Sequence, residues 1–200
     1  HDDIKVDGYD AITSTMTTAY PMFAISSPLF KDLAKFDYIT VKYKLTYSSG
    51  SGVIGIKGTT GDVYNYPSVT KTADGWTLST WRRDREGTGI AVWNYIEQNG
   101  IIDFRIYAFD GGKGATTTLT IAEIAGGYDD IVYDGTAINL LDKTGLTETE
   151  FSAIFTPAGG NAAVVSDIAQ FIPSSSGELK LIINKSGYRT TEIIIGVSVV

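Results

Sequence analysis

The sequence contains no cysteine and only one histidine, His1. Without cysteine the chain cannot form disulfides, thiolate metal sites or a cysteine nucleophile. Because its only histidine stands at position 1, the interior offers no residue for a Ser-His-Asp triad or a histidine-ligated zinc site. The two absences exclude the commonest histidine- and cysteine-based chemistries from the core of the protein.

An excess of positive charge and a long apolar run are also missing. Sixteen Lys and Arg stand against 23 Asp and Glu, which gives a net charge of -7 and argues against nucleic acid as a partner. The longest apolar run, residues 193–200, falls well short of the roughly 18 residues of a membrane span and fits a buried strand. We therefore expect no membrane insertion. Because the chain does not begin with Met, we expect it to be a mature product or a fragment. We also expect it to be part of a larger, multidomain protein.

Strict alternation of apolar and polar residues marks residues 36–47 as a strand. Ile39, Val41 and Tyr43 fall on one face, and Lys42 and Lys44 fall on the other. Similar short segments separated by glycine-rich turns follow, and we expect strands at residues 22–25, 53–57, 75–82, 89–96, 102–109 and 117–124. No long amphipathic helical pattern separates them, so the sequence predicts an all-β protein built as an antiparallel β-sandwich.

A shift in composition predicts two domains, residues 1–130 and residues 131–200. The first segment holds all three tryptophans and ten of the twelve tyrosines. The second is expected to be a small β-rich domain with a helix over residues 147–155, a strand over 162–172, and a hairpin of residues 177–183 and 188–199. One sandwich with a C-terminal extension is the alternative organisation.

Several segments of the first domain resemble a known family. They are Phe-Asp-Tyr-Ile-Thr-Val at 36–41, Trp76 after Asp-Gly, Ile-Asp-Phe-Arg-Ile-Tyr-Ala at 102–108 and Thr-Leu-Thr-Ile-Ala-Glu-Ile at 118–124. Together they resemble the jelly-roll, galactose-binding-like carbohydrate-binding modules of secreted bacterial glycan-degrading and surface proteins. Residues 185–195 are similar to the last hairpin of bacterial immunoglobulin-like modules. The resemblance implies an extracellular, non-catalytic module that binds a polysaccharide or oligosaccharide; some such modules carry a structural calcium.

The alternation in the middle strands predicts a sugar-binding platform. Aromatic rings stack on the C–H surfaces of sugars while planar polar groups bond to the hydroxyls. On each of three strands one apolar set is expected to point inward: Trp76 and Leu78, Ile90 and Val92, and Phe104 and Ile106. The opposite face would then present Trp81, Arg83, Trp93, Tyr95, Arg105 and Tyr107. Core packing of Trp76 and Trp93 is the competing interpretation. The loop at residues 62–67, which contains Tyr64 and Tyr66, is a second candidate location.

Two other functions remain open. A small jelly-roll glycosidase could use Glu97 with Asp103, Glu86 or Glu123 as its second carboxylate. A structural or adhesive module of a bacterial surface protein would bury its aromatic residues and bind no sugar. A structural calcium would need several oxygen ligands, but we interpret the clustered acids as solvated strand ends. These acids are Asp2, Asp3, Asp7, Asp10, Asp129 and Asp130.

Overall fold

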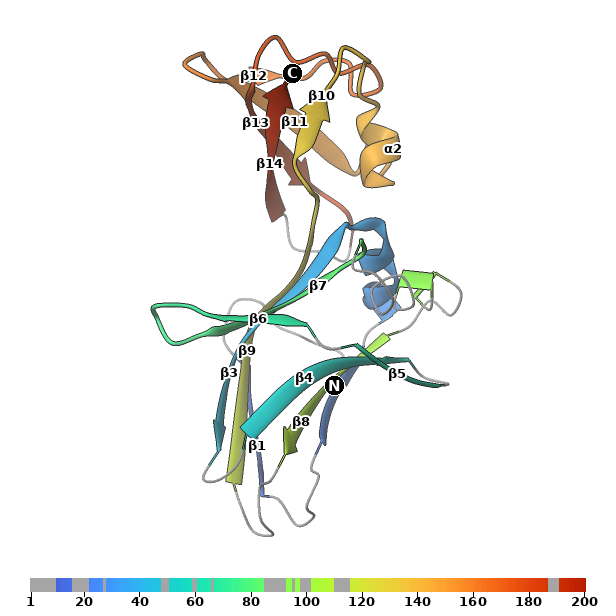
Figure 1. Cartoon of the computed structure of the whole chain (residues 1–200). Helices are drawn as coiled ribbons and strands as arrows, with labels where there is room; N and C mark the ends of the chain where they lie inside the picture. The colour runs from blue at the N-terminus through green and yellow to red at the C-terminus, as the bar shows by residue number, and fades with distance from the viewer. Residues whose placement is uncertain are drawn as a thin grey trace. The chain divides into compact units, whose positions relative to one another are not determined.

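The computed structural model divides into two compact units, His1–Gly126 (unit 1) and Gly127–Val200 (unit 2) (Figure 1). It describes residues 10–15, 22–26, 28–47, 51–58, 61–65, 67–84, 93–94, 96–97, 102–109, 116–186 and 191–200. Strands predominate in both units, which confirms the predicted all-β, sandwich-like class. Within these ranges, no helix has both the length and the apolar character that a membrane crossing requires.

Unit 1 contains two antiparallel sheets. The five-stranded sheet has the order β1 (Asp10–Thr15), β9 (Thr116–Gly127), β3 (Tyr38–Tyr47), β7 (Thr77–Arg82) and β6 (Ser68–Lys71). The four-stranded sheet has the order β2 (Met22–Ser26), β8 (Ile102–Phe109), β4 (Ser51–Gly58) and β5 (Gly61–Asn65). If the short edge strand β6 is set aside, the chain crosses between two four-stranded sheets in the order of a jelly roll.

Two parts of unit 1 differ from the sequence prediction. The segment expected to be a loop at residues 62–67 lies largely in strand β5, and strand β6 follows it. The sequence predicts a strand over residues 89–96. The residues described here, 93–94 and 96–97, are helical instead. A 3-10 helix, η1 (Pro28–Lys35), lies between β2 and β3.

Unit 2 has one five-stranded sheet, in the order β10 (Ile131–Tyr133), β14 (Thr191–Val199), β13 (Gly177–Ile183), β11 (Phe151–Pro157) and β12 (Ala163–Val164). The pairs are antiparallel except that β10 runs parallel to β14. Alternate residues of the central strands fill the core, as period-two alternation requires. They include Leu179, Leu181, Ile195, Val197 and Phe151.

The helix of unit 2 lies earlier in the chain than predicted. Helix α2 (Leu140–Thr144) begins after Asn139, whose side-chain oxygen accepts hydrogen bonds from the Leu141 and Asp142 amides. The predicted helix at residues 147–155 is wrong, although the Thr147 amide does donate to the Glu150 carboxylate at 3.0 Å. That bond closes a turn, because the alternating apolar residues after it form β11 instead. The strand expected over 162–172 is reduced to β12 and an isolated bridge between Ile138 and Phe171.

Candidate functional site

The two tryptophans of the predicted platform lie in the core of unit 1. The side chains of Trp81 and Trp93 are each 1% exposed, so the prediction that they face solvent is wrong. Trp76 is 8% exposed, and all three tryptophans of the chain are therefore buried. A sugar ring cannot stack on Trp81 or Trp93 as they lie here.

The register of β7 explains the burial of Trp81. Trp81 pairs with Ile39 and Ser79 pairs with Val41, so both lie on the core face of the sheet. Two apolar residues, Trp76 and Leu78, had suggested the opposite orientation. The core accepts Ser79 because its hydroxyl donates a hydrogen bond to the Tyr43 hydroxyl at 3.4 Å, which lowers the cost of burying a polar group.

Helical periodicity explains the burial of Trp93. Trp93 and Ile96 are three residues apart, which puts them on one side of a helix, and both are 1% exposed. Asn94 and Glu97 have the same spacing and are exposed. The Trp93 indole N–H donates to the Phe36 carbonyl at 2.8 Å, which satisfies its only polar group. The predicted strand over the same residues puts Trp93 on the outer face instead.

Arg83, another predicted site residue, forms an exposed ion pair with Glu97. Its Nη2 lies 2.6 Å from Glu97 Oε1, with the two side chains 44% and 46% exposed. Arg83 also binds the η1 region, since its Nη1 donates to the Ala34 carbonyl at 3.4 Å and its amide to the Asp37 carbonyl at 2.8 Å. The pair therefore holds the helical segment against the chain that precedes β3.

The structure does not describe the side chains of the remaining predicted site residues. Tyr95 lies outside the described residues. Arg105 and Tyr107 belong to β8, where their backbones pair with Ala24 and Met22 of β2, but their side chains lie outside the description. In the candidate loop, residues 62–65 form part of β5 but their side chains also lie outside the description, as does Tyr66. The structure thus brings none of the six platform residues together on an exposed face among the side chains it describes.

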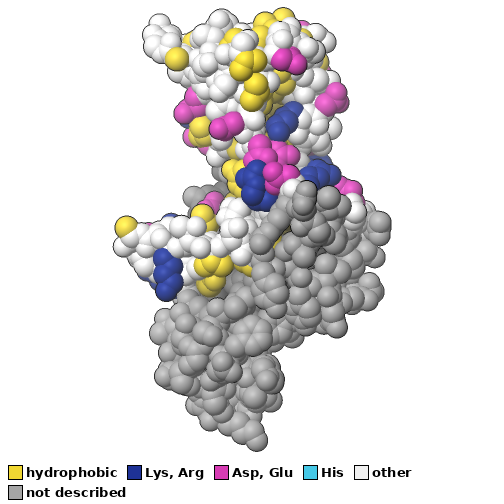
Figure 2. All heavy atoms as spheres, in the orientation of Figure 1, with side chains coloured by type: hydrophobic (Ala, Val, Ile, Leu, Met, Phe, Trp, Pro, Cys, Tyr) yellow, Lys and Arg dark blue, Asp and Glu magenta, His cyan; other side chains and the backbone are white. Residues whose placement is uncertain are grey.

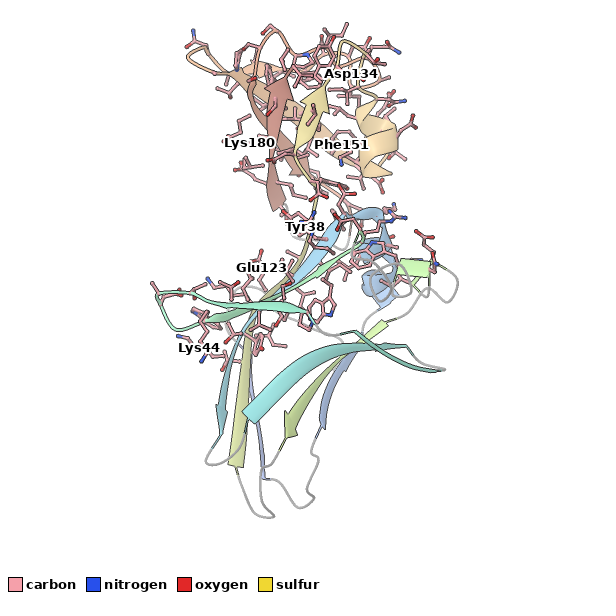
Figure 3. All side chains as sticks on the ribbon, viewed as in Figure 1. Tyr38, Lys44, Glu123, Asp134, Phe151 and Lys180 are labelled. Atoms are coloured by element: carbon pink, nitrogen blue, oxygen red, sulfur yellow. The ribbon has the colours of Figure 1, made fainter. Side chains whose placement is uncertain are left out.

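A different group of side chains comes together on the other face of the five-stranded sheet. The ammonium of Lys44 lies 4.5 Å from the centroid of the Trp76 ring, and that of Lys42 lies 5.7 Å from it. Both distances are within the range of a cation–π interaction. We call the surface formed by Lys42, Lys44, Trp76 and Leu78 the lysine face; Figure 3 labels Lys44 beside the β6–β7 hairpin.

The β6–β7 turn fixes Trp76 at the edge of the lysine face. The Trp76 amide donates to the Thr72 hydroxyl oxygen at 3.1 Å, and the Thr72 amide donates to the Trp76 carbonyl at 2.8 Å. Gly75 has a φ of 81°, a left-handed conformation that favours glycine. These hydrogen bonds hold the backbone of Trp76 in place and so restrict the position of its indole ring.

Asp74 in this turn is the carboxylate nearest to the lysines among the described residues. One of its oxygens lies 3.8 Å from Lys42 Nζ, and the other accepts a hydrogen bond from the Thr72 hydroxyl. The Thr72 bond, followed by the charge of Lys42, lowers the pKa of Asp74 below its ordinary value of 3.8. Within the described part of the chain, no carboxylate forms a comparable ion pair with Lys44.

Hydroxyl side chains lie on the same face of the sheet as the lysines, on the next two strands, β7 and β6. In the strand register Lys42 pairs with Leu78, Leu78 pairs with Thr70, and Thr80 pairs with Ser68. Ser68 and Thr70 are exposed, and Leu78 and Thr80 are half-buried. Figure 2 shows Lys or Arg side chains and hydrophobic side chains together over the β6–β7 hairpin. The lysine face therefore offers cationic donors, hydroxyls and a small apolar surface.

The acids considered for calcium do not form a metal site in the described part of the chain. The Asp130 carboxylate accepts a hydrogen bond from the Gly196 amide at 2.9 Å, which ties it to β14. Asp2, Asp3 and Asp7 lie outside the description, as does the side chain of Asp10. No cluster of three or more metal-ligating side chains occurs within the described ranges.

Comparison with known proteins adds no family to this geometry. No protein-family model matches the chain, and a search of curated proteins finds no significant relative.

Proposed function

We propose that unit 1 binds a polysaccharide without cleaving it, and that the lysine face is the binding surface. The observation that carries the proposal is the placement of two lysine ammoniums over the Trp76 ring, on a sheet face that also carries exposed hydroxyls and half-buried Leu78. Ammonium and hydroxyl groups can bond to sugar oxygens, and Leu78 offers C–H contact. The strand order of unit 1 and its resemblance to carbohydrate-binding modules support the same function in a secreted or surface protein.

The geometry at Glu97 supports a binding role over a hydrolytic one. The acid of a glycosidase usually sits in an apolar pocket that favours its neutral form. Glu97 is instead half-exposed and ion-paired with Arg83 at 2.6 Å. Glu123, one of the partners considered for it, lies exposed on β9.

Affinity electrophoresis of the full chain in gels that contain soluble neutral or acidic polysaccharides tests the proposal. Retardation without release of reducing sugar is the expected result. Trp76→Leu should weaken retardation, because it removes the ring that holds both ammoniums while keeping an apolar side chain. Tyr133→Leu, which changes a half-buried aromatic residue in unit 2, should leave retardation unchanged. Sugar release that disappears in Glu97→Gln would instead establish a hydrolase.

A structural or adhesive module is the second candidate function. The burial of all three tryptophans favours it, because their rings then serve packing rather than stacking. This candidate expects a blue-shifted tryptophan emission together with no retardation on any polysaccharide. Lack of retardation across the panel would therefore replace the first proposal with the second.

A further inference from the structure

We propose that the ligand of the lysine face is an anionic polysaccharide, one whose sugars carry carboxylate or sulfate groups. The inference rests on the proposed function, because it names the class of polysaccharide that unit 1 binds. It depends on the local balance of charge around Trp76.

Two positive charges share one aromatic ring on this face. Lys42 and Lys44 are two residues apart on β3, so their side chains leave the same face of the sheet. Both ammoniums are attracted to the Trp76 ring, and they repel each other. An anion that binds both lysines would relieve this repulsion, whereas a neutral sugar would not.

Asp74 offsets only part of this charge. It lies 3.8 Å from Lys42 Nζ, beyond hydrogen-bond distance, and its carboxylate is already engaged by the Thr72 hydroxyl. Lys44 is exposed, and its ammonium presents N–H donors beyond those directed at the ring. The face therefore keeps surplus positive charge on a chain whose net charge is -7.

The overall acidity of the chain does not cancel this local surplus. At physiological ionic strength, exposed charges separated by more than about 8 Å are largely screened from each other. A bound anion would therefore respond mainly to the charges close to it, which include Lys42, Lys44 and Asp74.

The surface suits a sparsely charged polymer with hydroxyls. Duplex DNA binding proteins neutralise many phosphates with many basic residues, and here two lysines form the described cationic group. The hydroxyls of Ser68, Thr70 and Thr80 on the neighbouring strands can both donate and accept, which matches the hydroxyls of a sugar. Acidic polysaccharides combine the two kinds of group.

The test compares retardation of the full chain by four polymers: polygalacturonate, chondroitin sulfate, a neutral glucan and duplex DNA. Polygalacturonate and chondroitin sulfate distinguish carboxylate from sulfate as the source of the anion. We expect one or both to retard the chain, and added salt to weaken the effect. The double variant Lys42→Gln/Lys44→Gln should lose about tenfold or more in affinity, as expected for two exposed ion pairs.

Two variants sharpen the test. The matched control is Lys143→Gln/Lys180→Gln in unit 2, which makes the same change in net charge and removes a lysine that lies 5.9 Å from the Tyr128 ring. It should retain the affinity of the unaltered chain. Asp74→Asn should bind the acidic polymer several-fold more tightly, because it removes the competing carboxylate beside Lys42. Thermal unfolding checks that each variant is folded.

Each outcome bears on one statement. Equal or stronger retardation by the neutral glucan overturns the anionic class while leaving polysaccharide binding intact. Retardation by no glycan overturns the proposed function itself. Equal loss in the two double variants overturns the lysine face as the site, and binding of DNA as tight as that of the polysaccharides assigns the surface to polyanions in general.

Discussion

The five-stranded sheets of units 1 and 2 fill their cores in the same way but treat the lysines on their other faces differently. In unit 1, Lys42 and Lys44 lie over the Trp76 ring, and of the described carboxylates only Asp74 forms an ion pair with either of them, at 3.8 Å from Lys42. In unit 2, Lys180 lies 3.1 Å from Glu192, a diagonal neighbour on the adjacent strand. The second arrangement neutralises its own charge, and the first does not.

The difference separates a lysine that serves the sheet from lysines available to a ligand. A cross-strand ion pair is a common way to stabilise a sheet surface. Two ammoniums that share one aromatic ring, with an ion pair to only one of them, add little to the stability of the fold. Their mutual repulsion opposes their attraction to the ring. The neighbours of Lys180 also differ, since Ile194 beside it is 46% exposed while the lysine face carries hydroxyls. Figure 2 shows such exposed hydrophobic side chains on unit 2.

The largest expected effect comes from truncating a tryptophan on the core face of the unit 1 sheet, compared with truncating the tryptophan on its other face. Trp81→Ala should lower the free energy of unfolding of unit 1 by about 3–5 kcal/mol, because it leaves a large cavity beside Ile39. Trp76→Ala should cost clearly less, since flexible lysine side chains cover its ring. Urea unfolding followed by circular dichroism measures both values. A cost for Trp76→Ala equal to that of Trp81→Ala would mean that both faces are core.

The same pair of tryptophans shows how far the sequence could be interpreted. The alternation of β3 correctly puts Ile39, Val41 and Tyr43 on the buried face, and Lys42 and Lys44 on the other. Inside β7 the apolar residues occur at both parities, so the register with β3 decides the orientation. That register depends on a long-range pairing and on the Ser79–Tyr43 hydrogen bond, and neither is visible in the local pattern.

The spacing of apolar residues was the other source of ambiguity, because it was compatible with both a helix and a strand. At residues 93–97 a three-residue spacing of Trp93 and Ile96 fits a helix, while alternation of nearby residues suggested a strand. At residues 147–155 the helix-start signal of Thr147 and Glu150 is real but closes only a turn. The final hairpin was predicted well, because strands β13 and β14 have long apolar alternation and strong turn residues between them.

A close approach of backbone in unit 2 gives the second prediction. A Cβ on Gly177 would meet the Thr156 carbonyl oxygen and lie 2.9 Å from Pro157 Cα, so the paired strands β11 and β13 would have to separate. Gly177→Ala should destabilise unit 2 by about 1–3 kcal/mol, as overpacking does. Unit 1 should unfold as before in the same urea titration. Gly135→Ala, where a Cβ has open space but φ is +100°, separates backbone strain from steric contact.

The third prediction tests the two classes of lysine directly. Lys180→Gln should lower the stability of unit 2 by at most about 1 kcal/mol at low salt, and the loss should shrink at high salt. Lys44→Gln should leave unit 1 unchanged or slightly more stable, because it removes one of two like charges. Chemical unfolding at two salt concentrations gives both numbers. Similar salt-sensitive losses in both units would end the distinction between structural and ligand-binding lysines.

The smallest expected effect is a pH dependence at Asp74. Its pKa is lowered in the folded protein by the Thr72 hydroxyl and then by Lys42, so the ionised carboxylate stabilises unit 1 at every pH above the unfolded value of about 3.8. This contribution is lost as the pH falls through the lower folded value. Asp74→Asn should therefore narrow the difference in stability of unit 1 between pH 5 and pH 2.5, roughly the range over which such a carboxyl titrates. Thr72→Val should have the same effect, because it removes the main cause of the lowered pKa of Asp74. If acid unfolding of either variant coincides with that of the unaltered chain, ionised Asp74 does not stabilise the turn. Because protonation also releases Lys42 from its only described carboxylate, acid should weaken the turn and free the lysine together, which links the stability of the hairpin to the charge of the proposed binding face.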